Sequence, residues 1–210
     1  MNLPFDAFFC ADYIRANSPD IAPAQLRAEQ ARLKVPCLGA LGCRFLSLCA
    51  AMKQPKTAID VGCGIGASTF SMHQGAPAAR ITAIDGNVER AATCAELMKD
   101  IPQITVHNAL ALPFLQATDE RYDFAFVDSV KKMYLPIWQL LRTKLNPGAV
   151  VLFDDVLLYG YTAEDEATVP LKYQDGRREL REFIDVLSAD DAIVSQIVPL
   201  DGGMLLCWLH

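Results

Sequence analysis

The chain has 210 residues, of which 52% are hydrophobic and 21% charged, so it can bury a sizeable core and does not have the composition of a disordered segment. Its formal net charge of -6 and its pI near 5.0 do not favour nucleic acid or an anionic membrane as a partner, because phosphate groups are bound by clustered Lys and Arg. A small molecule is the expected partner.

Features of a targeting or membrane-spanning segment are not visible. Asp6 precedes the first basic residue, Arg15, and the apolar stretch Val35–Met52 is interrupted by Arg44. The seven cysteines are odd in number and include no Cys-x-x-Cys pair, which favours reduced thiols. We therefore expect a cytoplasmic protein that does not contact a membrane.

The first third of the chain predicts helices. Apolar residues between Phe5 and Ile14, and within Gln25–Leu33 and Leu41–Met52, recur at helical spacing. No linker long enough to separate two domains is present. We expect one domain over residues 1–210, in which a helical cover (1–52) precedes a Rossmann-like core (57–210).

Short β-rich runs alternate with helical stretches from residue 57 onward. This alternation predicts crossover connections and an α/β fold with a parallel, doubly wound sheet. The last two runs are joined by Asp201-Gly202-Gly203, a hairpin that would place one antiparallel strand in the sheet. The predicted strands are Thr57–Val61, Ile81–Asp85, Ile104–His107, Asp123–Asp128, Ala149–Asp154, Ala192–Leu200 and Met204–Leu209.

The segments between these strands predict helices and loops. Val88–Lys99 and Met133–Lys144 have helical patterning, as has the region of Leu180–Leu187. Asn146-Pro147-Gly148 predicts a turn before the fifth strand. Tyr159–Gly176, rich in Asp, Glu and Tyr, predicts a loop that covers the substrate.

A glycine loop follows the first strand and precedes a helix. Gly62, Gly64 and Gly66 allow sharp turns and close approach to a ligand, and a helix N-terminus offers free N–H groups. Gly62, Gly64 and Ala67 also satisfy the dinucleotide fingerprint, so an NAD-dependent oxidoreductase is one alternative and a plain strand-to-helix turn another. Asp60 favours a ligand with an ammonium group over a pyrophosphate.

Asp85 ends the second strand. A carboxylate there can accept hydrogen bonds from both hydroxyls of a ribose, as in NAD or S-adenosylmethionine (AdoMet). Alone, such an Asp is as often a helix cap. Its position after the glycine loop favours the ribose role.

Three carboxylates follow the predicted fourth and fifth strands. Asp128, Asp154 and Asp155 would converge at one sheet edge, where Mg²⁺ or another divalent cation would offset their repulsion. Helix capping by Asp128 and a turn role for Asp155 are the alternatives. Lys131 is close enough in sequence to reach the same cleft as a general base, or it simply begins a solvated helix together with Lys132.

These residues together resemble the cation-dependent O-methyltransferase family, which includes catechol and caffeoyl-CoA O-methyltransferases. The likeness runs from about Pro36 to the C-terminus. It lies in Asp60–Ser68, Asp85, Tyr122–Lys131, Asn146–Gly148, Phe153–Leu157, Arg181–Phe183 and Gly202–Leu206. It implies an AdoMet-binding, Rossmann-like fold with a mostly parallel seven-stranded sheet. It also implies metal-assisted methyl transfer to a hydroxyl of a small catechol-like or phenolic acceptor.

The resemblance further implies roles for single residues. Asp60, Gly62 and Ser68 would hold the methionine end of AdoMet, and Asp85 its ribose. The cofactor-binding residues expected from it are Asp60, Gly62, Gly64, Gly66, Ser68, Asp85, Asn108, Ala109 and Asp128, with Asn108 and Ala109 beside the adenine.

The same resemblance assigns the chemistry. Asp128, Asp154 and Asp155 align with the metal ligands, and Lys131, acting with Asp128, aligns with the catalytic base. The family usually has Asn at the position of Asp155. We also expect a homodimer. An AdoMet-binding protein without activity is the remaining alternative.

Overall fold

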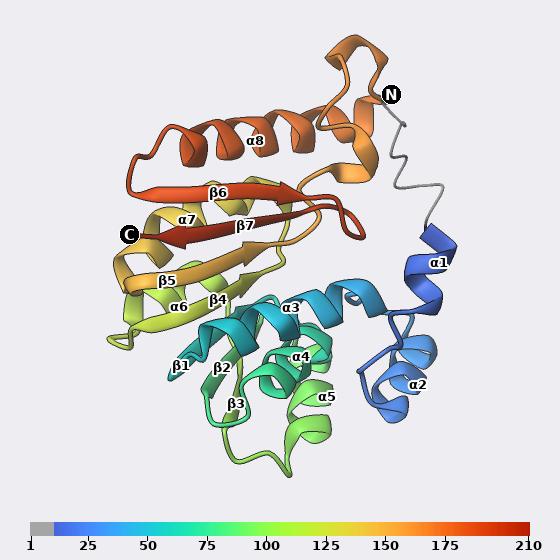
Figure 1. The fold of residues 1–210 in the computed structure, drawn as a ribbon, viewed down its shortest axis with the longest axis vertical. Helices are drawn as coiled ribbons and strands as arrows, with labels where there is room; N and C mark the ends of the chain where they lie inside the picture. Colours follow the sequence, from blue (N-terminus) through green and yellow to red (C-terminus); the bar gives the residue numbers. More distant parts are fainter. Residues whose placement is uncertain (1–10) are drawn as a thin grey trace.

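The computed structural model describes residues 11–210 and contains one seven-stranded sheet (Figure 1). The strand order is β3-β2-β1-β4-β5-β7-β6. Neighbours from β3 to β5 pair in parallel, whereas β7 is antiparallel to both β5 and β6, which confirms the predicted fold class and hairpin. The strands are β1 Thr57–Val61, β2 Arg80–Asp85, β3 Ile104–Asn108, β4 Tyr122–Val127, β5 Leu145–Phe153, β6 Ile193–Val198 and β7 Met204–Leu209.

Helices cover both faces of the sheet and create two hydrophobic cores. One core packs α6, α7 and α8 against the sheet, and the other packs α2 to α5 against the opposite face. Figure 1 shows α3, α4 and α5 in front of the sheet, with α6 and α7 behind it. The helices are α1 Ala11–Ala16, α2 Ala24–Leu33, α3 Ala40–Lys53, α4 Ala67–Gly75, α5 Val88–Met98, α6 Ala111–Ala117, α7 Tyr134–Leu141 and α8 Leu171–Ser188. Short 3₁₀ turns are η1 Lys131–Met133, η2 Arg142–Lys144, η3 Leu158–Gly160 and η4 Glu166–Thr168.

The central strands are apolar because both of their faces are covered. All five residues of β1 are buried. Its alternate side chains belong to the two different cores: Ala58 lies in the core that contains α3 and α4, and Ile59 lies in the core that contains α7. No helix within residues 11–210 is long and apolar enough to cross a membrane.

The predicted turn at Asn146-Pro147-Gly148 is wrong, because β5 already begins at Leu145. These residues form an irregularity within the strand, at which the register with β4 shifts. Gly148 has a φ of 75°. A bulge absorbs residues such as Pro and Gly that would otherwise end a strand.

Two further segments differ from the prediction. The helix α8 begins at Leu171, so the predicted loop Tyr159–Gly176 is too long at its C-terminal end. The helix α6 was not predicted, because it has only 7 residues and contains Pro113. Phe5, Phe8 and Phe9, which were assigned to an N-terminal helix, lie outside the described residues.

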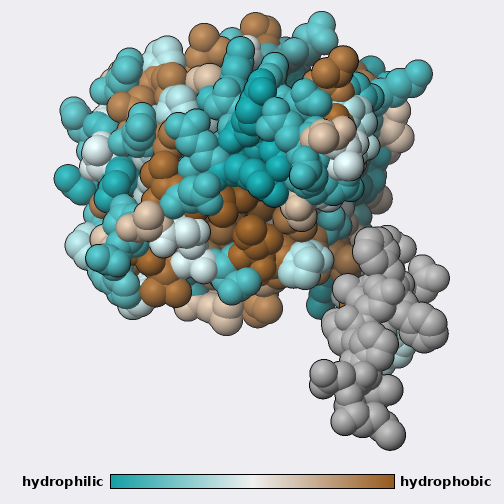
Figure 2. All heavy atoms as spheres, turned by 90° about the horizontal axis from the view of Figure 1, so that it is seen from above, coloured by the Kyte–Doolittle hydropathy of each residue, from teal (hydrophilic) through white to brown (hydrophobic). Residues whose placement is uncertain are grey.

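Some apolar side chains remain exposed near the β6 edge of the sheet. Val194 on β6 and Trp208 on β7 are paired neighbours, and both are exposed. Figure 2 shows hydrophobic side chains gathered on one face beside a strongly polar band. Such patches are typical of interaction surfaces. The homodimer stays a prediction.

The closeness of β1 to β4 predicts a cost for a side chain at Gly62. A Cβ there would overlap the carbonyl oxygen of Asp128, and Gly62 has a φ of 89°. We expect Gly62→Ala to lower the free energy of unfolding by about 3 kcal/mol, from backbone strain and overpacking. Denaturant unfolding measures this change.

Gly64→Ala is the matched control. Gly64 has a φ of 54°, but its Cβ would meet nothing within 4 Å, so we expect a loss of only about 1 kcal/mol. Equal losses in the two variants would contradict the close approach at Gly62.

Candidate active site

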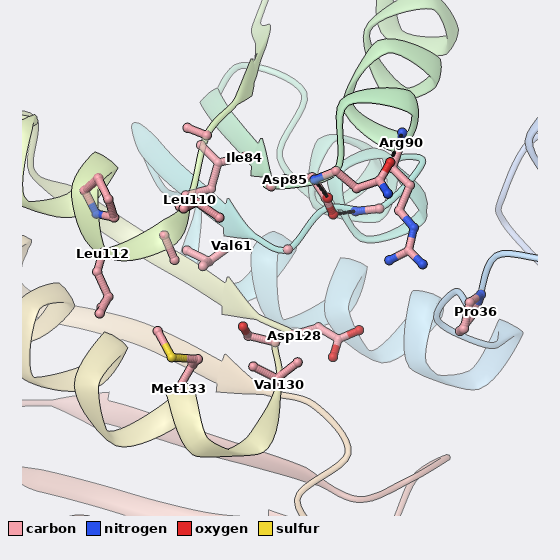
Figure 3. Close-up of a pocket in the computed structure, with 18 residues that line it drawn as sticks. Pro36, Val61, Ile84, Asp85, Arg90, Leu110, Leu112, Asp128, Val130 and Met133 are labelled. Carbon is pink, nitrogen blue, oxygen red and sulfur yellow. Dashed lines mark hydrogen bonds between the residues drawn. The ribbon is translucent and has the colours of Figure 1, made fainter.

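A cleft of about 710 Å³ lies where β1, β2 and β4 end (Figure 3). Its polar wall contains Gly62, Gly64 and Asp85, and its apolar wall includes Leu110 and Leu112. This is the edge at which ligands bind in parallel α/β sheets. The volume suits a ligand of nucleoside size or larger.

The glycine loop is fixed by backbone hydrogen bonds. The N–H groups of Gly62 and Cys63 both donate to the carbonyl oxygen of Ile84, at 2.8 and 3.0 Å. The open space beside the Gly64 Cα leaves room for a ligand to approach the backbone. Gly66, the third predicted glycine, does not line the cleft; it packs against α5, where a Cβ would contact Met98.

Asp85 lies on the cleft wall at the end of β2. One carboxylate oxygen accepts the N–H of Gly64 at 2.9 Å, and the other accepts the N–H of Asn87 at 2.7 Å. Asn87, whose side chain accepts the N–H of Arg90, caps α5, so Asp85 is not the helix cap. Each oxygen of Asp85 retains acceptor capacity for a ligand hydroxyl.

Asp60 lies beneath the loop rather than on the cleft wall. It is completely buried, and its Oδ2 accepts hydrogen bonds from the Ser68 hydroxyl at 2.7 Å and the Thr69 hydroxyl at 2.5 Å. Its Oδ1 has no partner among the described residues. Burial raises the pKa of Asp60 to about 7, although the hydrogen bonds from Thr69 and Ser68 oppose the rise. A buried acceptor without a donor fits a cationic group bound nearby.

Thr69 also belongs to the site, although its role was not predicted. The signal was a second hydroxyl next to Ser68 in the first turn of the helix that follows the loop. Both hydroxyls bond the same carboxylate oxygen, so they hold Asp60 in one orientation.

The two residues expected beside the adenine have different positions. Ala109 lines the cleft, and its N–H donates to the carbonyl oxygen of Asp85 at 3.0 Å. Asn108 is exposed and is not on the cleft wall; its amide donates to the same carbonyl oxygen at 2.9 Å. Asn108 therefore supports the strand end, while Leu110 and Leu112, which were not predicted, supply apolar surface.

The three predicted metal ligands differ in their contacts. Of these, only Asp128 lines the cleft. Asp154 is buried, and its Oδ1 accepts the N–H of Asp155 at 2.8 Å. The Oδ2 of Asp155 forms an ion pair with Lys131 Nζ at 2.9 Å. Within residues 11–210, no group of His, Cys, Asp and Glu side chains is arranged to hold a metal ion.

Burial changes the pKa values of the carboxyl groups at this site. Burial, followed by the nearby Asp128, raises the pKa of Asp154 to about 7. The enclosing walls also raise the pKa of Asp128, although Lys131 opposes the rise. Neither Asp128 nor Asp155 accepts the capping hydrogen bond of a following helix.

Lys131 is anchored by a buried tyrosine that sequence analysis missed. Lys131 Nζ donates to the Tyr134 hydroxyl at 3.1 Å, and that hydroxyl donates to the carbonyl oxygen of Asp154 at 2.6 Å. The Lys131 side chain is only 15% exposed. Lys131 is therefore not the start of a solvated helix, and it lies with Asp155 beside the cleft rather than on its wall.

A doubly wound parallel sheet, a glycine loop and an acid at the end of β2 define a Rossmann-like protein with a cleft for a nucleoside-bearing cofactor. The chain belongs to the O-methyltransferase family, whose sequence model matches residues 22–209. The resemblance of the motifs to this family is thereby confirmed.

Two plant proteins illustrate the similarity. The caffeoyl-CoA O-methyltransferase of Populus kitakamiensis is 28% identical over 176 residues, covering 78% of this chain and 74% of the relative. Tapetum-specific methyltransferase 1 of Arabidopsis thaliana is 28% identical over 171 residues, covering 78% and 73%.

Solved structures share the fold. An SAH-bound methyltransferase from Podospora anserina has a TM-score of 0.83 at 21% identity, covering 100% of this chain and 99% of that one. The O-methyltransferase from Bacillus cereus in complex with SAH has a TM-score of 0.79 at 18% identity, covering 97% and 96%. At these identities the likeness establishes the Rossmann-like fold.

Burial of Asp60 predicts a pH-dependent effect of its replacement. Because the folded-state pKa of about 7 lies above the ordinary 3.8, the contribution of this carboxyl to stability is complete below pH 3.8 and is lost as the pH rises through 7. We expect Asp60→Asn to be more stable than the parent protein at pH 8, by about 1–4 kcal/mol, and to lose most of this advantage at pH 5. Thermal unfolding without ligand at the two pH values measures the difference, and an equal difference at both would contradict a raised pKa.

Proposed function

We propose that the protein transfers a methyl group from AdoMet to a hydroxyl oxygen of a small acceptor. The cleft that contains Gly64 and Asp85 carries this proposal, together with the unpartnered oxygen of Asp60 beneath it. AdoMet has a ribose, an adenine and two cationic groups, and each finds a matching surface here. Membership of the O-methyltransferase family supplies the reaction class.

Each wall of the cleft has a role in this proposal. Asp85 accepts hydrogen bonds from the ribose hydroxyls, and Ala109 and Leu110 pack against the adenine. The backbone of Gly62 and Gly64 approaches the methionine end, where the ammonium group offsets the charge of Asp60. Asp60 is one layer behind the wall, so its influence is electrostatic.

The chemical step needs positioning and a destination for one proton. A lone pair of the acceptor oxygen attacks the methyl carbon while the carbon–sulfur bond breaks and its electron pair stays on sulfur. Asp128, on the cleft wall, is placed to take the hydroxyl proton. Lys131, a predicted base, acts here as a fixed positive charge beside the developing oxyanion, since its Nζ already bonds Asp155 and Tyr134.

An aromatic cluster is our candidate for the acceptor cover. The rings of Tyr161 and Tyr173 stack at 4.9 Å, and Tyr159 lies 5.6 Å from Tyr173. A Cβ at Gly176, one turn further along α8, would lie 3.8 Å from Lys131 Cγ, which connects this cluster to the active site. Flat phenolic or catechol-like acceptors suit such rings.

A labelled-methyl assay tests the proposed activity. We expect transfer of label from AdoMet to at least one member of a panel of phenols and catechols, with O-methylated product identified by mass spectrometry. Binding of AdoMet without transfer to any panel member would favour the alternative of a binding protein that lacks this activity.

Calorimetry tests the cofactor. We expect AdoMet to bind and NAD not to bind, because a pyrophosphate would gain nothing from the carboxylates at the loop. Asp85→Ala should weaken AdoMet binding by about 1–3 kcal/mol, since ribose hydroxyls lose a charged acceptor. Asn108→Ala is the matched control: Asn108 bonds the Asp85 backbone but lies off the cleft wall, so the affinity should stay nearly unchanged. Equal losses of affinity in both variants would show that Asp85 affects AdoMet binding only by holding the end of β2 in place.

A further inference from the structure

We propose that the Lys131 ammonium takes, in this chain, the place of the divalent cation that the family resemblance implied, and that methyl transfer proceeds without a metal. The inference rests on the proposed function, because it concerns the same acceptor site. It starts from the ion pair between Lys131 Nζ and Asp155 Oδ2.

A metal site needs several oxygens that face one point. Asp155 does not offer its oxygens in this way: Oδ2 bonds Lys131, and Oδ1 is packed so tightly against Gly202 that a Cβ there would overlap it. The Oδ1 of Asp154 is bonded to the N–H of Asp155. Of the three carboxylates, Asp128 alone is open to the cleft.

The backbone holds Asp155 in this arrangement. Asp155 has a φ of 50°, in the left-handed region. Directly after it, the N–H groups of Val156 and Leu157 donate to the carbonyl oxygens of Gly203 and Gly202, both at 2.9 Å. Turning the Asp155 carboxylate toward the cleft would leave the ammonium without its partner.

The ammonium is equally constrained. Tyr134, which is completely buried, accepts a hydrogen bond from Lys131 and donates one to the backbone of Asp154. Its ring packs 5.9 Å from Phe153 and 5.6 Å from Phe183. A fixed cation therefore stands among the carboxylates, and it occupies the position from which a metal would contact Asp155.

The presence of Asp rather than Asn at position 155 fits this arrangement. An Asn side chain is neutral and cannot form the ion pair, so Lys131 would lose its charged partner. With Asp155, the additional negative charge is matched by an ammonium of the same chain. Removing the Lys131 charge should leave three carboxylates without a cation and thereby create a metal site.

The test measures Mn²⁺ binding by electron paramagnetic resonance, which needs neither AdoMet nor an acceptor. We expect the parent protein to bind Mn²⁺ weakly, and Lys131→Met to bind one Mn²⁺ with a Kd at least about tenfold lower. Lys132→Met is the matched control, since the neighbouring Lys132 is exposed, and it should behave like the parent. Lys131→Gln serves as a second variant, and thermal unfolding shows that each variant is folded.

Methyl transfer provides the second measurement. We expect the parent rate to be the same in excess chelator and in excess Mg²⁺. The proposal is overturned if chelator abolishes parent transfer, if the parent binds one Mn²⁺ as tightly as Lys131→Met, or if neither Lys131 variant gains affinity. If no acceptor is methylated at all, the proposed function fails by itself, and the Mn²⁺ measurements still decide whether Lys131 excludes the metal.

Discussion

Because Gly62 has no Cβ, the carbonyl oxygen of Asp128 can lie where that atom would be, and the cleft depends on this close approach of the ends of β1 and β4. A hydrogen bond also joins these two strand ends: the N–H of Asp128, which follows β4, donates to the carbonyl oxygen of Val61, the last residue of β1, at 2.9 Å. Because β1, β2, β4 and β5 are parallel, the glycine loop, Asp85, Asp128 and the Asp154-Asp155 pair all emerge at one edge of the sheet. A side chain at Gly62 would separate the two strands that carry the cofactor loop and the acceptor residues.

Several Asp side chains lie at this edge of the sheet, and each has different partners. Asp60 is held by two hydroxyls, Asp85 by two backbone N–H groups, and Asp155 by the ammonium of Lys131. Asp154 and Asp128 have raised pKa values, first because burial disfavours their charged forms and then because another carboxylate lies near each of them. A cleft with this excess of carboxyl groups attracts a cationic ligand, and the sulfonium and ammonium of AdoMet both fit that field.

Backbone strain is concentrated next to the same edge. Asp155, Leu158 and Tyr159 all have positive φ values, within a few residues of the end of β5. Left-handed conformations cost free energy in residues other than glycine, and they persist where surrounding contacts enforce them. Here the hydrogen bonds to Gly202 and Gly203 and the ion pair with Lys131 provide those contacts, so the β6–β7 hairpin helps to shape the acceptor side of the site.

The sequence by itself determined the alternation of strands and helices, the glycine loop and the final hairpin, because these depend on local patterns of apolar residues, glycines and turns. The bounds of β1, for example, were predicted as Thr57–Val61, and the structure has the same bounds. Tertiary structure decided what each polar side chain touches. Thr69 and Tyr134 form hydrogen bonds that were not predicted, Asn108 does not line the cleft, and Asp155 forms an ion pair with Lys131. Those outcomes depend on packing between segments far apart in the chain, such as the hairpin against the end of β5, and no local pattern specifies the direction in which a carboxylate turns once two strand ends meet.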